Sequence, residues 1–87
     1  MPHVYIIQSL KNLRYYVGST TNLTQRIIEH NNGKSNYTKS TNPFKLVFSK
    51  EFSTIKEAKQ MEYRIKKLKS RVIIEKIIKD NDILMKL

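Results

Sequence analysis

The sequence predicts an α+β fold, in which three helices flank a small, mostly antiparallel three-stranded sheet in the order β-β-α-β-α-α. Two β-prone runs stand on either side of a short polar break, and a third alternating run begins near residue 44. Three further segments have helical periodicity, and each follows residues that commonly cap helices. No repeat, linker or low-complexity tract divides the chain, so we expect residues 1–87 to form one domain.

The first element is a predicted hairpin from Val4 to Gly18. Alternation along residues 4–9 predicts that one face packs and the other meets solvent. Asn12, in the polar break, is the residue expected to take a left-handed backbone conformation. Closing the hairpin there would bring Tyr5 and Tyr16 together at its open end. The glycine that ends the second run allows either a tight turn or the close approach of a ligand.

A short helix is predicted to follow the capping cluster at residues 19–22 and to stop at the Asn-Asn-Gly of residues 31–33. Leu23 and Ile27 form its apolar stripe. Arg26 and His30 are four residues apart and lie along one border of that stripe. A border position allows both side chains to lean over the edge of the neighbouring sheet.

The second half of the chain predicts one strand and two helices. The strand, residues 44–52, has one face with Leu46, Phe48 and Lys50 and another with Val47 and Glu51. The first of these helices starts after Ser53-Thr54, runs for about fifteen residues and carries Glu62 near the margin of its apolar stripe. Ser70 starts the last helix. The expected apolar positions of the two helices are Ala58, Met61, Ile65 and Leu68, followed by Val72, Ile73, Ile74, Ile77 and Ile78.

The composition is strongly basic, with 17 Lys and Arg against 7 Asp and Glu and a net charge of +10. Such a chain is expected to bind polyanions through salt-sensitive phosphate contacts, the alternative being a solvated surface with a basic bias. No run approaches the roughly 20 apolar residues that span a bilayer, so no membrane partner is expected. The absence of cysteine excludes disulfides and thiolate metal sites and fits a cytoplasmic protein.

A polar loop is predicted over residues 34–43, where Lys34, Tyr37 and Lys39 interleave basic and aromatic side chains. This mixture suits a phosphate backbone with a stacked base. A solvated loop with no ligand explains the same composition equally well.

Several of these residues together resemble the motifs of the GIY-YIG nuclease superfamily. Tyr5 occupies the tyrosine position of the first motif, and Tyr16-Val17-Gly18 is similar to the second, with Val in place of Ile. Arg26, His30 and Glu62 continue the pattern in the expected order. The first motif lacks its glycine. The chain is most similar to short stand-alone members, which resemble the first catalytic domain of the bacterial excision-repair nuclease.

The resemblance implies phosphodiester hydrolysis with one divalent metal, Mg²⁺ or Mn²⁺, in the setting of DNA repair. By this resemblance Glu62 is the metal ligand and Arg26 stabilises the charged phosphate. Tyr5 is then the general base or water-positioner, with Tyr16 beside it and His30 as a supporting donor or proton shuttle. A phenol is ionised only about one part in a thousand at pH 7, so a nearby cation is expected to lower the pKa of Tyr5.

The implied partner is nucleic acid; DNA is favoured, and the sequence leaves RNA open as the alternative. Its expected contacts are Gly18, Arg14, Lys34, Tyr37 and Lys39. A recruiting protein would supply specificity, and the sequence leaves the oligomeric state open. The alternative function is a non-catalytic nucleic-acid binding module on the same fold.

Simpler structural interpretations exist for each site residue. The tyrosines can be packing residues of the sheet. Arg26 can pair with Glu29, and Glu62 with Lys66, at helical spacing. His30 can interact with the dipole at the end of its helix. A late asparagine seen in many members has no clear counterpart here, and Asn81 is not assigned to that role.

Overall fold

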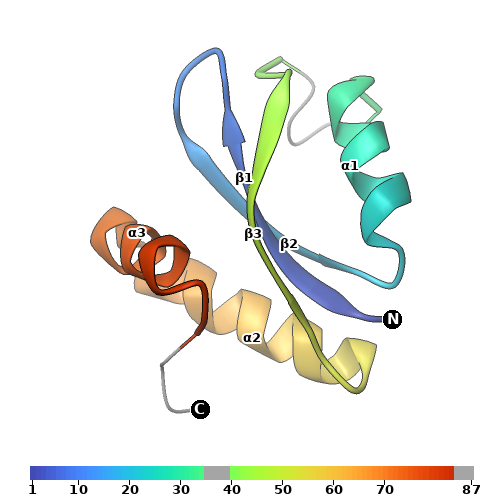
Figure 1. Cartoon of the computed structure of the whole chain (residues 1–87), viewed down its shortest axis with the longest axis vertical. Helices are drawn as coiled ribbons and strands as arrows, with labels where there is room; N and C mark the ends of the chain where they lie inside the picture. The colour runs from blue at the N-terminus through green and yellow to red at the C-terminus, as the bar shows by residue number, and fades with distance from the viewer. Residues whose placement is uncertain (35–39, 84–87) are drawn as a thin grey trace.

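The computed structural model describes residues 1–34 and 40–83, and within them the predicted order of elements is confirmed (Figure 1). The α+β architecture comprises, in chain order, β1 (His3–Ser9), β2 (Tyr15–Thr20), α1 (Leu23–Asn31), β3 (Phe44–Glu51), α2 (Ile55–Leu68) and α3 (Arg71–Asp80). In the described part of the chain, no helix is long and apolar enough to cross a membrane.

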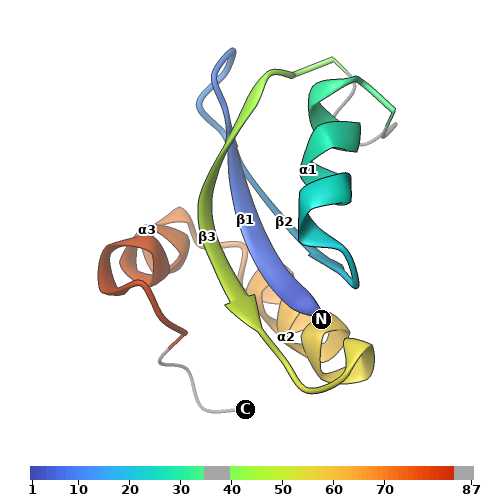
Figure 2. The ribbon, with the colours of Figure 1, turned by 45° about the vertical axis from the view of Figure 1, so that its right-hand side comes forward.

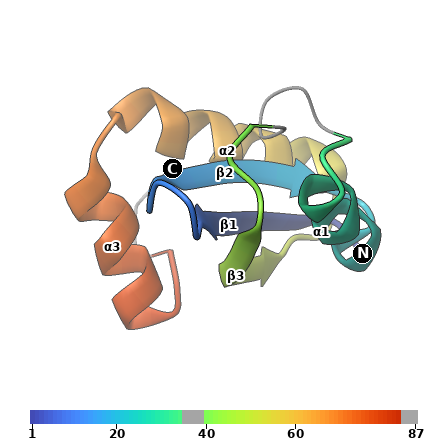
Figure 3. The same cartoon turned by 90° about the horizontal axis from the view of Figure 1, so that it is seen from above.

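The sheet is antiparallel, with β1 in the centre and β2 and β3 at the edges. Helix α1 covers one face, and α2 with α3 covers the other (Figures 2 and 3). Residues 4–7 of β1 are therefore all buried. The predicted solvent-facing side of the hairpin is wrong, because a central strand covered by helices on both faces has no exposed side.

Each face of the sheet has its own apolar core. Tyr5, Ile7 and Phe44 pack toward α1, with Tyr16, Leu23 and Ile27 at their border. Val4, Ile6, Val17 and Phe48 pack toward the other two helices, with Ala58, Met61, Ile65, Ile77 and Ile83. The alternation of β1 thus divides its side chains between two cores.

The hairpin turn differs from the prediction in two respects. Leu13, not Asn12, takes the left-handed conformation, with φ of 63°. Asn12 instead accepts a hydrogen bond from the Arg14 backbone N–H through its side-chain Oδ1, at 2.9 Å. Tyr16 pairs with Ile7 and lies near the turn, whereas Tyr5 pairs with Gly18 toward the open end. The two tyrosines share a face but occupy diagonal positions.

Strand β3 contains an irregularity that changes which residues share a face. Leu46 pairs with Ile7, but Phe48 pairs with the adjacent Ile6, so the register shifts between them. A bulge places one extra residue opposite the partner strand and reverses the alternation. Leu46 and Phe48 therefore lie on opposite faces, and the predicted shared face is wrong. Val47 packs with the core of Phe48 instead of opposing it.

The helix starts are confirmed, with Asn22, Thr54 and Ser70 each accepting a hydrogen bond from a backbone N–H of the first turn. Two predicted core positions are wrong. Leu68, in the last turn of α2, is 46% exposed, and Val72 is 75% exposed. At about 100° per residue Val72 points some 140° away from the buried Ile77, so it cannot face the sheet with it.

Candidate active site

A pocket of about 110 Å³ brings together all five residues expected to take part in catalysis. They reach it from four elements: Tyr5 from β1, Tyr16 from β2, Arg26 and His30 from α1, and Glu62 from α2. The remaining lining residues are Ile7, Val17, Gly18, Ser19 and Lys66.

The pocket lies at β2, an edge strand, and this position explains how two layers contribute to it. Tyr5 belongs to the α1 face of the sheet, whereas Glu62 comes from a helix on the opposite face. Ser19 bridges them, since its Oγ donates a hydrogen bond to Glu62 Oε1 at 2.5 Å. A carboxylate from one layer can reach the other only where no further strand intervenes.

The hydroxyl of Tyr5 is held inside the protein by two neighbours. It hydrogen-bonds His30 Nε2 at 2.8 Å, and both side chains are buried, with 3% and 2% exposed. The Arg26 guanidinium also lies near the phenol and lowers its pKa. Burial raises the pKa of Tyr5 by more than Arg26 lowers it. Arg26 thus acts on the pKa in the expected direction, but desolvation disfavours the phenolate more strongly and the net shift of the Tyr5 pKa is upward.

His30 is correspondingly hard to protonate. Burial, and then the positive charge of Arg26, lower the pKa of its imidazole below the ordinary value of 6.5, and Glu29 opposes them only in part. The neutral ring carries one proton, and with that proton on Nδ1 the Nε2 atom accepts from the Tyr5 hydroxyl. His30 is therefore a buried hydrogen-bond partner of Tyr5 and does not lie exposed at the border of α1.

Tyr16 has different neighbours although it lines the same pocket. Hydrogen bonds with Thr41 and then with Asn12 lower the pKa of Tyr16. Its ring packs edge-on against Phe44, with centroids 5.4 Å apart. The two phenols of the site therefore differ: Tyr5 is buried against a histidine, and Tyr16 is the more acidic group near the hairpin turn.

Glu62 is the only carboxylate among the described residues that line the pocket. Lys66 Nζ donates to its Oε2 at 2.6 Å, while Ser19 occupies Oε1. In the described ranges no group of three or more His, Cys, Asp or Glu could hold a metal ion. One carboxylate with nearby hydroxyl oxygen fits a hard divalent cation that keeps most of its water ligands, and it does not fit a fully protein-bound metal.

The structure gives a reason for a glycine at position 18 that is neither the tight turn nor the close approach of a ligand named in the prediction. It lies within β2 opposite Tyr5, so it makes no tight turn. A Cβ atom at this position would overlap the phenol ring of Tyr5. The absence of a side chain lets the ring lie across the strand and keeps its hydroxyl on His30.

Two of the other expected nucleic-acid contacts, Arg14 and Lys34, lie outside the pocket. Arg14 and Lys34 are exposed, and Arg14 lines a neighbouring groove shared with Lys66. Tyr37 and Lys39 lie outside the described residues. The simpler ion pairs do form, Arg26 with Glu29 at 3.2 Å as well as the Lys66 pair, and they coexist with the pocket.

Sequence reasoning missed the part that Ser19 plays in the pocket and treated Lys66 only as a surface partner. A signal was available for Ser19, because it directly follows Gly18 and its side chain must point to the opposite face of the strand. That face is the one covered by α2, which carries Glu62.

Two tyrosines, an arginine, a histidine and a glutamate meet at the sheet edge of this α+β domain. A domain with this fold and this site belongs to a class of nuclease catalytic domains. Residues 1–78 match the family model described as the GIY-YIG catalytic domain, and the chain is a member of the GIY-YIG family. This is a nuclease family, which implies a nucleic-acid substrate, and its members generally use a divalent metal.

The relatives are small stand-alone proteins. The chain is 42% identical to UPF0213 protein YazA of Bacillus subtilis (strain 168), over 76% of this chain and 68% of that protein. It is 41% identical to UPF0213 protein CPE1444 of Clostridium perfringens, over 94% and 92%. A solution NMR structure of UPF0213 protein BH0048 from Bacillus halodurans matches with a TM-score of 0.55 at 36% identity, covering 91% of this chain and 84% of that one.

Proposed function

We propose that residues 1–87 form a single metal-dependent endonuclease domain that hydrolyses phosphodiester bonds, in DNA rather than RNA. The observation that supports this most is the pocket at β2, where Tyr5, Arg26, His30 and Glu62 converge from three separate elements. Ion pairs and packing account for these residues singly but do not require them to meet. DNA repair in the cytoplasm is the setting that the resemblance to excision-repair nucleases favours.

In this proposal Glu62 would hold one Mg²⁺ or Mn²⁺ ion, with Ser19 fixing the orientation of the carboxylate. The bound ion would neutralise phosphate charge and stabilise the leaving oxygen. Lys66, which pairs with Glu62 through Oε2, would compete with the ion for this carboxylate. Arg26 lies within hydrogen-bonding reach of Tyr5 and offers its remaining donors to the phosphate as negative charge develops.

Tyr5 acts as a proton relay in this scheme and does not need to be a phenolate. An ordinary phenol is ionised to about one part in a thousand at pH 7, and because burial raises the pKa of Tyr5 its ionised fraction is smaller still. The attacking water gives a proton to the Tyr5 oxygen, and the Tyr5 proton passes to His30 Nε2, 2.8 Å away. The products of this transfer are a hydroxide aimed at phosphorus, a neutral tyrosine and an imidazolium.

The test is a cleavage panel of structured DNA and RNA substrates with and without Mg²⁺ or Mn²⁺. Glu62→Gln should abolish metal-dependent cleavage and leave the fold intact. Glu57→Gln is the matched control, since Glu57 lies on the same helix but outside the pocket. Cleavage that is unchanged in Glu62→Gln would remove Glu62 from the site, and the absence of cleavage from every wild-type reaction would refute the nuclease proposal.

A non-catalytic nucleic-acid binding module is the second candidate. The observation that favours it is the close pairing of Glu62 with Lys66, which neutralises the carboxylate that a metal would need. This function predicts salt-sensitive binding that is unaffected by divalent metal. In either case a recruiting protein would select the target.

A further inference from the structure

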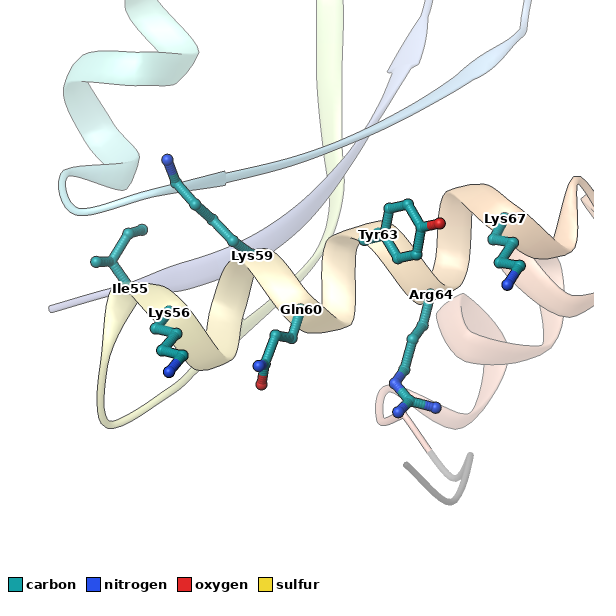
Figure 4. Close-up of a pocket in the computed structure, with 7 residues that line it drawn as sticks. All are labelled: Ile55, Lys56, Lys59, Gln60, Tyr63, Arg64 and Lys67. Atoms are coloured by element: carbon teal, nitrogen blue, oxygen red, sulfur yellow. The ribbon is translucent and has the colours of Figure 1, made fainter.

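Helix α2 has a second chemically distinct side that faces away from the sheet. A hollow of about 840 Å³ runs along it, and the side chains that line it project from the helix over its whole length (Figure 4). We define the basic face of α2 as its exposed residues Lys56, Lys59, Tyr63, Arg64 and Lys67. The hollow is larger than the pocket at β2, but its lining has no carboxylate or histidine, so it is suited to binding and not to metal chemistry.

The four cations of this face are not neutralised by neighbouring acids. Of the carboxylates that the structure describes, none lies within 4.0 Å of Lys56, Lys59, Arg64 or Lys67. Other cations do pair, for example Lys76 with Asp80 at 3.6 Å. Four like charges on one helix repel each other and destabilise it slightly, and an anionic ligand would remove that repulsion.

Tyr63 lies among these cations and is 64% exposed. Its ring is not part of either apolar core, and Lys67 Nζ lies 5.9 Å from the ring centroid. Exposed aromatic rings beside lysines provide a stacking surface next to phosphate-binding charges. The combination favours nucleic acid over an anionic protein, which offers no bases to stack.

The basic face is also continuous with the pocket, because the same helix carries both. Lys66 and Glu62 line the pocket. In sequence, Lys59 stands three residues before Glu62, and Tyr63 directly follows Glu62 and stands three residues before Lys66. From Lys56 to Lys67 the helix extends roughly 16 Å at about 1.5 Å per residue. That length matches about five base steps of roughly 3.4 Å each along one strand.

We propose that the basic face of α2 is a docking surface for the phosphate backbone of the nucleic acid beyond the bond that is cleaved. This inference rests on the proposed function, because it takes the substrate to be nucleic acid. The docking surface positions a strand along α2 so that the strand continues past Lys66 into the pocket.

The test compares two triple variants that lose the same charge. One is Lys56→Gln, Lys59→Gln and Lys67→Gln, and the control is Lys45→Gln, Lys76→Gln and Lys79→Gln, exposed residues of β3 and α3. Binding of labelled single-stranded and duplex DNA is measured in EDTA over a salt series, so that no cleavage occurs. Circular dichroism checks that both variants fold.

We expect the plot of log affinity against log salt to be shallower for the α2 variant, with a slope smaller in magnitude by about 2 to 3, since each lost phosphate contact contributes about 0.9. The control should retain the wild-type slope. Tyr63→Ala should weaken single-stranded DNA binding about tenfold, as expected for the loss of a stacked base. An equal fall in both triple variants would reduce the effect to net charge and overturn the docking surface. The docking surface would also be overturned if the α2 variant lost binding to anionic vesicles but bound DNA as wild type does.

Failure of this inference can be told apart from failure of the proposed function. If wild type cleaves and the α2 variant binds DNA as wild type does, only the docking surface is refuted. If wild type never cleaves but the α2 variant loses binding, the docking surface stands and the nuclease proposal falls.

Discussion

Replacing Tyr5 by phenylalanine removes one oxygen atom from the centre of the candidate site and leaves the ring in place. That oxygen hydrogen-bonds His30 Nε2 at 2.8 Å and lies near the Arg26 guanidinium, which lowers the pKa of the phenol. The ring would still cover Gly18 and pack with the α1 core. The substitution therefore tests the proton relay with little change in packing.

The expected effects on stability and on cleavage differ in size. Losing the hydroxyl leaves a buried histidine nitrogen without this partner, which costs about 1–3 kcal/mol of unfolding free energy. Positioned proton transfer contributes about 10²–10⁴-fold to rates. We therefore expect Tyr5→Phe to remain folded and to bind DNA in EDTA like wild type, while its single-turnover cleavage rate falls at least about hundredfold.

Tyr16→Phe is the matched control for this experiment. Its hydroxyl interacts with Thr41 and Asn12, so the change should affect the hairpin turn more than the relay. A Tyr5→Phe protein that is folded and cleaves at the wild-type rate would refute the relay. If Tyr16→Phe were the inactive variant instead, the more acidic phenol would be the base.

Three further predictions concern His30, the Ser19–Glu62 hydrogen bond and the backbone of Leu13. The pKa of His30 is lowered in the folded state, so the stability that neutral His30 contributes is present above pH 6.5 and is lost as the pH falls toward the folded pKa. Cleavage rate measured against pH should likewise show an acid limb with its midpoint below pH 6.5. Ser19→Ala removes the bond that orients Glu62, so Mn²⁺ affinity by calorimetry should fall about tenfold or more. Leu13→Gly places glycine at a left-handed position and should raise the urea-derived unfolding free energy by about 1 kcal/mol.

Each of these predictions has a control within the chain. His3→Gln should leave the acid limb unchanged, because His3 does not line the pocket. Ser49→Ala changes an exposed serine of β3 and should not affect Mn²⁺ affinity. Leu10 is 56% exposed, as is Leu13, but its φ is not positive, so Leu10→Gly should not stabilise the protein. Equal responses of a variant and its control would contradict the reasoning.

Local patterns predicted the elements well because capping and alternation act over a few residues. The helix starts at Asn22, Thr54 and Ser70 follow from side chains that bond their own first turn. The same reasoning failed at β3, where the bulge reverses the faces of Leu46 and Phe48. A bulge depends on the partner strand, and nothing in residues 44–52 alone indicates it.

The candidate site could be predicted as a set of residues but not as a chemical environment. The order of Tyr5, Arg26, His30 and Glu62 was enough to name them through the resemblance. The lowering effect of Arg26 on the pKa of Tyr5 was predicted, but the larger effect of burial was not, because burial depends on how the layers close over the side chain.

The sequence by itself determined the charge of +10, the order of the elements and the family to which the chain belongs. Only the tertiary structure decided that Ser19 ties Glu62 to the sheet edge, that Tyr5 bonds His30 inside the protein, and that the cations of α2 form a face of their own. The physical reason is range. Capping and periodicity are written into neighbouring residues, whereas desolvation and convergence depend on which layers of the fold meet in space.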